Sequence, residues 1–501
     1  MLYDVLHIAL ALLIFLYLTA KLKHDLHMLQ QNSYRNERYR RWRAQHLAQE
    51  AWWRLWHPFL KAPAKKPLVM TARAKRLYIT ALCIAALPLL AVIALPFIAL
   101  PLPALAALIL LYLSVIFFSG YYLILINWLL QPLEKIINLR YLNEAKTILV
   151  QRPDLMRVGI TGSYGKTSMK MILSAMLSER YITLATPDSV NTPMGVTRII
   201  REQLKPIHQV FICEMGAKQA GDIAELCDLV QPQTGILTAI GLQHLETFGS
   251  EEAIAHTKFE LIRALPPTGL AVLNLSQEAI AARVEQAPCR VAGYGLSGQP
   301  YHAEDILYSV GGLSFTLVTP QGERQPMISR LLGQHNIENI VGAAAAAAEL
   351  GLTLPQIARA VRSLNPLPHR LQLISGPGYT IIDDSFNSNP AGAAAALAVL
   401  AQMGEGQKIL ITPGMVELGE KQHELNRDFA MAAAKICDFI ILVGKKHSQS
   451  LQEGLLLAGF SSERHVVAAD LAQARTLLAQ HICPGDTVLF ENDLPDMYLE
   501  N

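Results

Sequence analysis

The segment that most constrains the fold is a glycine-rich loop, Thr161-Gly162-Ser163-Tyr164-Gly165-Lys166-Thr167-Ser168. An apolar run ends at Ile160 immediately before this loop, and a helical pattern follows it over Met169–Leu177. A strand, a glycine loop and a helix in this order are typical of a P-loop, whose backbone N–H groups face phosphate oxygens. Lys166 can then reach the β- and γ-phosphates, and the Thr167 hydroxyl can bind Mg²⁺. The spacing matches the variant TGxxGKT, and it predicts an α/β domain that binds ATP.

Charge divides the chain into two parts. The formal net charge is only +2, which gives the chain as a whole no electrostatic preference for nucleic acid. Residues 1–150, however, hold 17 basic and 6 acidic side chains, whereas residues 151–501 carry a net charge of −9. At 501 residues, about three domains are expected. The six cysteines are scattered without a CxxC pair, so neither a disulfide framework nor a structural zinc site is predicted.

The first 150 residues contain long apolar stretches. From Leu77 to Leu133 there are 57 residues without Asp, Glu, Lys or Arg, and about 20 apolar residues suffice for one membrane crossing. We therefore expect an all-α transmembrane module, with crossings at about 5–20, 77–95 and 104–130. Residues 21–76 carry 14 basic and three acidic side chains, which places that loop in the cytoplasm. The expected location is the inner cell membrane, multi-pass, with membrane lipid as a partner, the N-terminus outside and the later domains on the cytoplasmic face.

Further motifs follow the P-loop in a fixed order. They are Asn191–Val196, Glu214–Ala217, Gly241–Leu245, Ala255–Glu260, Gly333–Asn339, Pro368–Arg370, Asp383–Pro390 and Gly414–Gly419. Together with the P-loop, this series resembles the Mur ligase family, especially its D-alanyl-D-alanine-adding branch, over about 340 of the 501 residues. The resemblance implies a P-loop central ATP-binding domain at 151–367 and a Rossmann-like C-terminal domain at 368–501, after the module at 1–150.

The resemblance also implies an activity. Family members use ATP to phosphorylate a carboxylate, and an amine then displaces phosphate from the acyl phosphate to form an amide. We therefore expect an ATP-dependent acid–amino-acid (peptide) ligase that acts in cell-envelope or peptide-polymer synthesis. Its cofactors would be ATP and Mg²⁺, and its partners a carboxylate acceptor and an amino-acid or peptide amine.

Residue roles follow from matching each motif to the family. The expected catalytic residues are Lys166, Lys258, His244 and Arg370, and Lys258 matches the family's carbamylated lysine. The expected Mg²⁺ ligands are Thr167, Glu214, His244 and Lys258. The expected nucleotide-binding residues are Thr161, Gly162, Ser163, Gly165, Lys166, Thr167, Ser168, Asn336, Asn339, Arg370 and Asp384, of which Asn336 and Asn339 would face the adenine.

Two departures from the family leave the substrates open. The apolar module stands where family members carry a UDP-sugar-binding domain, and Glu491-Asn492-Asp493 stands where the branch has a Lys-Gly-Ser-Arg-like stretch. The missing cation weakens the expectation that the amine is D-alanyl-D-alanine. A poly-γ-glutamate-type ligase, a lipid-intermediate ligase and a catalytically silent, membrane-tethered nucleotide-binding regulator therefore remain alternatives.

Overall fold

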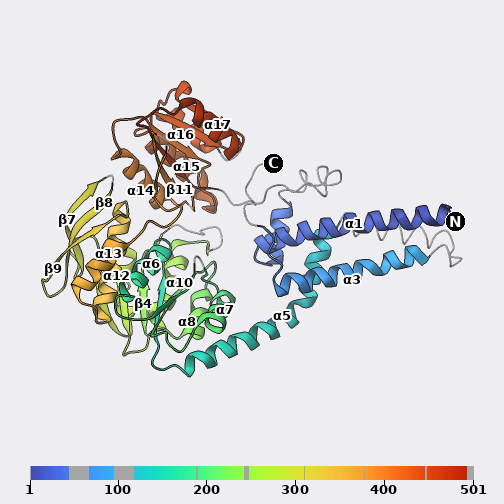
Figure 1. Ribbon diagram of the computed structural model, residues 1–501, viewed down its shortest axis with the longest axis horizontal. Helices are drawn as coiled ribbons and strands as arrows, with labels where there is room; N and C mark the ends of the chain where they lie inside the picture. Colours follow the sequence, from blue (N-terminus) through green and yellow to red (C-terminus); the bar gives the residue numbers. More distant parts are fainter. Residues whose placement is uncertain are drawn as a thin grey trace. The chain divides into compact units, whose positions relative to one another are not determined.

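The protein is described by a computed structural model that covers residues 2–44, 67–94, 118–187, 190–241, 248–309, 311–376, 378–386, 388–445 and 448–493. The chain divides into two compact units. The helical unit consists mainly of Met1–Leu139, and the α/β unit of Arg140–Leu494. Figure 1 shows both, and each is described by itself below.

Three long helices build the helical unit: α1 (Leu2–Gln31), α3 (Ala72–Ala94) and α5 (Ser119–Val150), which continues into the α/β unit. Leucines and alanines recur at a spacing of about four residues, so that each helix has an apolar face. These faces pack together into one buried cluster, formed by Leu18, Leu22, Leu26, Ala74, Leu77, Ala81, Ala85, Leu123 and Ile126. The unit therefore has a hydrophobic core of its own.

Polar side chains are also buried within the helical unit. Asp25 is 2% exposed and accepts hydrogen bonds from the Tyr39 hydroxyl at 3.1 Å, from Arg43 Nη1 at 3.2 Å and from the Ser119 hydroxyl. Arg76 donates two hydrogen bonds to the Glu134 carboxylate, at 2.7 and 2.6 Å. Buried charges are tolerated only when they are paired in this way, so these contacts fix how the helices pack.

The expected transmembrane module is wrong. Within the residues that the structure describes, no helix is both long and apolar enough to cross a membrane. The expected multi-pass membrane location and the expected outside position of the N-terminus depended on that module, so they are wrong as well. Membrane lipid is therefore not supported as a partner. One set of apolar residues from α1, α3 and α5 packs into a shared core, and others, such as Leu13, Leu87 and Trp128, are exposed. A run of apolar residues looks alike in sequence whether it faces lipid or another helix. Most of the expected third crossing, up to residue 117, lies outside the described residues.

The first sheet of the α/β unit has six parallel strands in the order β2-β3-β1-β4-β5-β6. Its central strands are continuous buried apolar runs, as is typical of parallel sheets covered by helices on both faces. The strands are β1 (Met156–Thr161), β2 (Thr183–Ala185), β3 (Val210–Glu214), β4 (Thr234–Leu237), β5 (Leu270–Asn274) and β6 (Arg290–Tyr294). The helices are α6 (Lys166–Leu177), α7 (Pro193–Gln203), α8 (Asp222–Val230), α10 (Glu251–Arg263), α11 (Glu278–Ala281), α12 (Gln334–Glu349) and α13 (Leu354–Ser363).

Two further sheets complete this unit. A three-stranded antiparallel sheet contains β7 (His302–Ser309), β8 (Gly312–Val318) and β9 (Arg324–Ser329). The other six-stranded sheet, termed the second sheet, has the order β10-β11-β15-β12-β13-β14, with only β10 antiparallel. Its strands are β10 (Gln372–Ser375), β11 (Thr380–Asp384), β12 (Lys408–Thr412), β13 (Phe439–Val443), β14 (His465–Ala468) and β15 (Thr487–Glu491). Its helices are α14 (Pro390–Ala401), α15 (Gln422–Ala433), α16 (Gln449–Leu457) and α17 (Leu471–His481). The expected α/β architecture is confirmed for this part of the chain.

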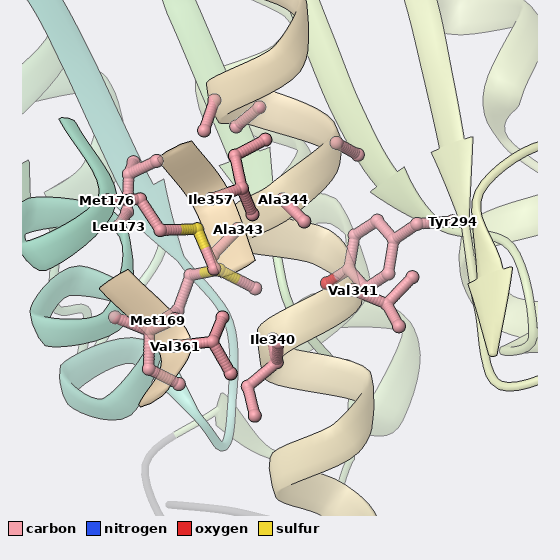
Figure 2. Packing of buried hydrophobic residues seen from close by; sticks show 14 of the residues in the cluster. Met169, Leu173, Met176, Tyr294, Ile340, Val341, Ala343, Ala344, Ile357 and Val361 are labelled. Atoms are coloured by element: carbon pink, nitrogen blue, oxygen red, sulfur yellow. The ribbon is translucent and has the colours of Figure 1, made fainter. Parts of the chain in front are cut away.

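The helix after the P-loop is held in place by close packing against α12. Met169, Leu173 and Met176 of α6 lie against the alanine run of α12, together with residues of α13 (Figure 2). The five alanines from Ala343 to Ala347 are all fully buried. Alanine combines a high helix propensity with a small side chain, so the two helices can approach closely and the start of α6 is fixed relative to the sheet.

This packing predicts that a larger side chain in the alanine run is destabilising. We expect Ala344→Leu to lower the free energy of unfolding by about 1–3 kcal/mol, because the added methyl groups overpack a filled core. The matched control is Ala394→Leu on the exposed face of α14, which should change it by less than about 0.5 kcal/mol. Urea denaturation followed by far-ultraviolet circular dichroism measures both, and equal effects would contradict the packing described.

Candidate active site

The P-loop connects the carboxyl end of β1 to α6. Gly165 ends the loop with a φ of 75°, and a Cβ added there would lie 2.7 Å from Asn339 Oδ1. The loop therefore requires glycine at this position. Lys166 Nζ donates hydrogen bonds to the carbonyls of Gly162 at 2.7 Å and Ser163 at 3.0 Å, so its ammonium group lies over the loop where phosphates would be bound.

The pKa of Lys166 is lowered to about 8. Burial is the main cause, the nearby Arg370 guanidinium adds to it, and the Glu214 carboxylate opposes it. A phosphate bound in the loop would favour the charged form of the amine. The positive charge of Lys166 is thus sensitive to whether an anion is present.

Glu214 lies at the carboxyl end of β3, directly beside the P-loop strand, where Ile160 is its partner in the register. Glu214 as a whole residue is 1% exposed. One carboxylate oxygen, Oε2, accepts hydrogen bonds from the Thr167 hydroxyl and from Lys170 Nζ, both at 3.0 Å. The other, Oε1, accepts one from Asn191 Nδ2 at 3.0 Å. This buried carboxylate therefore joins β3, α6 and the segment before α7.

Arg370 reaches this cluster from the segment that joins the two larger sheets. Its Nη2 lies 3.4 Å from the Thr167 hydroxyl, and its guanidinium lies 4.1 Å above the centre of the Phe386 ring. The neighbours His369 and Leu371 have φ values of 61° and 46°, which non-glycine residues rarely adopt. The backbone therefore turns sharply on both sides of Arg370. These turns bring the Arg370 side chain, from the segment just before β10, to the P-loop.

Asp384, at the end of β11, also faces this joint. Its Oδ1 accepts a hydrogen bond from the backbone N–H of Leu371 at 3.1 Å. Burial raises the pKa of the Asp384 carboxyl to about 6, although Arg370 and this hydrogen bond oppose the rise. Asp384 therefore braces the turn that carries Arg370.

A cavity of about 530 Å³ lies next to the P-loop, which falls within the usual range of small-molecule sites. Residues from the loop, α12, the joint and α14 line it, among them Gly165, Ser168, Asn339, Arg370 and Asp384. Asn336 lines it as well and donates from Nδ2 to the carbonyl of Leu332 at 2.8 Å. Both asparagines are 6% exposed. The expected adenine-facing amides and the P-loop thus share one cavity.

Lys258 lies on α10 and is 3% exposed. Its amine has no hydrogen bond or ion pair with any residue that the structure describes. Its pKa is lowered well below the ordinary value, chiefly by burial and further by the charge of Lys166, while Asp222 and Glu260 oppose the shift. A buried amine thus lies close enough to the P-loop lysine to be influenced by its charge.

The structure brings together most of the residues expected from the motifs. Thr161 is fully buried and donates to the Met215 carbonyl at 2.9 Å, and the Ser163 hydroxyl donates to the Gly241 carbonyl at 3.0 Å. His244 lies outside the described residues. Within those residues, no group of three or more His, Cys, Asp or Glu side chains is placed to hold a metal ion.

Two residues of the cluster were missed by the sequence reasoning as site residues. Lys170 is fully buried against Glu214, and Asn191 binds its second oxygen. The signal for Lys170 was a lysine among Met169, Ile172 and Leu173, on a helix that should bury this face. Asn191 lies in the Asn191–Val196 motif, but the motif alone assigns it no role.

The fold and this site define a class. A P-loop sheet, a second sheet whose segment supplies an arginine to the P-loop, and a buried carboxylate beside the P-loop threonine meet at one cavity. The Mur ligase middle domain matches residues 160–347, and the Mur ligase glutamate ligase domain matches residues 369–491. The chain belongs to the Mur ligase family, and it is an ATP-dependent peptide ligase of that family.

Several similar proteins carry the name of one branch of the family. A UDP-N-acetylmuramoyl-tripeptide–D-alanyl-D-alanine ligase of Mycobacterium leprae is 30% identical over 364 residues, which cover 67% of this chain and 70% of the relative. A ligase of the same name from Escherichia coli is 32% identical over 310 residues, 60% of this chain and 67% of the relative. The crystal structure of MurF from Acinetobacter baumannii has a TM-score of 0.66 at 27% identity and covers 72% of this chain and 78% of that one. MurF from Thermotoga maritima, solved with ADP, shares the fold at 24% identity, with a TM-score of 0.65 and coverage of 72% and 81%.

The comparisons also bear on the alternatives. They give no support to a poly-γ-glutamate-type ligase, to a lipid-intermediate ligase or to a catalytically silent regulator, and none to membrane anchoring. The family resemblance inferred from the ordered motifs is confirmed by the two domain matches.

The lowered pKa of Lys166 predicts that ADP binding weakens above about pH 8. Below this pH the amine is charged and attracts phosphate, and above it the unbound protein loses the charge. We expect the dissociation constant of ADP to rise between about pH 7.5 and 9.5, by at most about tenfold per pH unit, because one proton is involved. Isothermal titration calorimetry measures this. A Lys166→Arg variant, whose guanidinium stays charged, should have a flatter profile, and identical slopes would contradict the assignment.

Proposed function

We propose that this chain is a MurF-like ligase of peptidoglycan synthesis, which joins the carboxylate of a peptide substrate to the amine of D-alanyl-D-alanine with hydrolysis of ATP to ADP and phosphate. The observation that carries this proposal is the convergence of Lys166, Thr167, Glu214 and Arg370 beside one cavity. The names of the relatives support the choice of substrates.

In the first step, an oxygen of the acceptor carboxylate bonds to the γ-phosphorus of ATP, and the bond between that phosphorus and the bridging oxygen breaks to release ADP. Phosphoryl transfer depends mainly on positioning and on positive charge around the phosphate oxygens. We assign that charge to Lys166, which lies over the loop, and to Arg370, which approaches from the opposite domain.

A magnesium ion fits the same place. Mg²⁺ prefers hard oxygen ligands and is usually held by one or two carboxylates together with substrate phosphates and water. The Thr167 hydroxyl and the Glu214 carboxylate, 3.0 Å apart, form such a donor pair at the end of the P-loop. When bound, the ion would neutralise charge on the transferred phosphoryl group.

In the second step, the amine nitrogen attacks the acyl carbon, the carbon–oxygen bond to phosphate breaks, and the nitrogen loses a proton. The amine is expected at the second sheet, because Arg370 and Asp384 bring that sheet to the cavity. Glu491, which replaces the branch's basic stretch, is 1% exposed and is held by the hydroxyls of Ser388 and Thr412. Burial raises the pKa of the Glu491 carboxyl to about 8. Because this carboxyl group is buried and hydrogen-bonded inside the domain, it is not available to bind a cationic amine.

We also propose that Lys258 carries a carbamate, as its family motif implies. Its neutral amine would attack CO₂ to form an N–C bond with loss of one proton, and the product would be an anion near Lys166. The lowered pKa and the burial of the amine support this proposal.

We likewise propose the domain limits of 151–367 and 368–501 and the role of His244 as a metal ligand.

The proposed reaction predicts that ADP is released only when both substrates are present. Purified full-length protein is incubated with ATP, Mg²⁺, a UDP-linked muramoyl tripeptide and D-alanyl-D-alanine, and ADP and the mass of the new amide are measured. Lys166→Ala should reduce the rate by at least about a hundredfold, which is the scale of losing a charge that stabilises the transition state. ATP turnover that is indifferent to either substrate would rule the reaction out. Amide formation with a different amine would confirm the ligase but reject the dipeptide.

Replacing Lys258 should separate catalysis from folding. We expect Lys258→Met, which fills the same buried space without an amine, to reduce the ligase rate at least about tenfold, because the proposed carbamate can no longer form. Compared with natural protein that lacks the carbamate, its melting temperature should be equal or higher, because a buried amine without a partner destabilises the protein. A matched control is Lys146→Met at an exposed ion pair with Asp228. An unchanged ligase rate in Lys258→Met would contradict the role proposed for this lysine.

A further inference from the structure

Lys170 is the buried cation of the site that the reaction described above does not use. Its side chain is 0% exposed, and its Nζ lies 3.0 Å from Glu214 Oε2, whose side chain is 2% exposed. A charge in the interior is costly unless an opposite charge and hydrogen bonds compensate it. Glu214 is therefore compensated by an ammonium group that is attached to the P-loop helix itself.

The Glu214 carboxylate already has partners on both oxygens. Asn191 binds Oε1, while the Thr167 hydroxyl and Lys170 share Oε2. The pair proposed to hold Mg²⁺, Thr167 and Glu214, is thus preformed and electrically neutralised by Lys170. A divalent cation entering this place alone would be repelled by the nearby ammonium group, but the negative charge of nucleotide phosphates would offset the repulsion.

We propose that Lys170 is a positioning residue that takes the place of the metal's charge beside Glu214 in the nucleotide-free protein, so that a divalent cation enters the site only together with nucleotide. The inference rests on the proposed function only in taking Thr167 and Glu214 as metal ligands. It adds a reason for the order of binding: Lys170 holds the carboxylate in its binding position while it keeps the affinity for the free ion low.

The experiment measures metal binding to the full chain without any acid or amine substrate. Mn²⁺ binding is followed by electron paramagnetic resonance and Mg²⁺ effects by thermal melting, with and without ADP. In the natural protein we expect Mg²⁺ alone to leave the melting temperature unchanged, and Mg²⁺ with ADP to raise it more than ADP alone. In Lys170→Gln, which keeps a hydrogen-bond donor but loses the charge, we expect Mn²⁺ to bind without ADP about tenfold or more tightly than in the natural protein.

Three variants serve as controls. Lys170→Gln combined with Glu214→Gln should lose the nucleotide-free Mn²⁺ binding, because the carboxylate is gone. Lys170→Met should melt at a lower temperature that Mg²⁺ alone restores, whereas a lysine with a purely structural role would give a loss that Mg²⁺ does not repair. Lys146→Gln, at an exposed ion pair with Asp228, should bind Mn²⁺ as the natural protein does.

The outcomes decide the proposal in each case. Unchanged Mn²⁺ affinity in Lys170→Gln, or strong nucleotide-free binding at this site in the natural protein, would overturn it. If both Lys170 variants fold only when Mg²⁺ is present, that dependence supports it. If neither folds under any condition, the comparison of Mg²⁺ with and without ADP in the natural protein decides. An inactive ligase assay would leave these binding results unaffected, so the two failures are distinguishable.

Discussion

The structure of the site depends on one buried carboxylate. Glu214 ends a central strand, and no water-exposed surface is available to solvate its charge, since it is 1% exposed. The buried charge of Glu214 therefore needs hydrogen-bond partners from other elements. The helix after the P-loop and the segment before α7 provide them. Removing one partner would leave an unpaired charge in the interior, so these elements are constrained to one arrangement.

Close packing of α6 on α12 couples the arrangement around Glu214 to the rest of the domain. The start of α6 is held because its apolar face lies against the fully buried alanine run of α12 (Figure 2). The same α12 also supplies the asparagines of the cavity. The same helix thus packs against the helix that follows the P-loop and contributes to the wall of the cavity beside the P-loop. The position of Lys166 is in this way tied to the positions of Asn336 and Asn339.

Sequence reasoning succeeded where chemistry and position are local. The P-loop, its flanking strand and helix, and the place of Glu214 at a strand end all follow from short patterns. It failed where the answer depends on residues far apart in the chain. Asp25, Arg43 and Ser119 meet in one buried cluster that no local pattern indicates, and the apolar helices around them were taken for membrane crossings. The contact of Arg370 with Thr167 joins residues 203 positions apart, and only the family motif pointed to it.

The cavity beside the P-loop also has a consequence for inhibition. One wall of the cavity is formed by small and apolar residues of α14, among them Ala395, Ala398 and Val399. An uncharged compound that bound against this wall would lie in the cavity beside Arg370 and Asn339, although it resembled no part of ATP. Because the P-loop, Asn336 and Asn339 line the same cavity, such a compound would compete with ATP even without a phosphate group of its own.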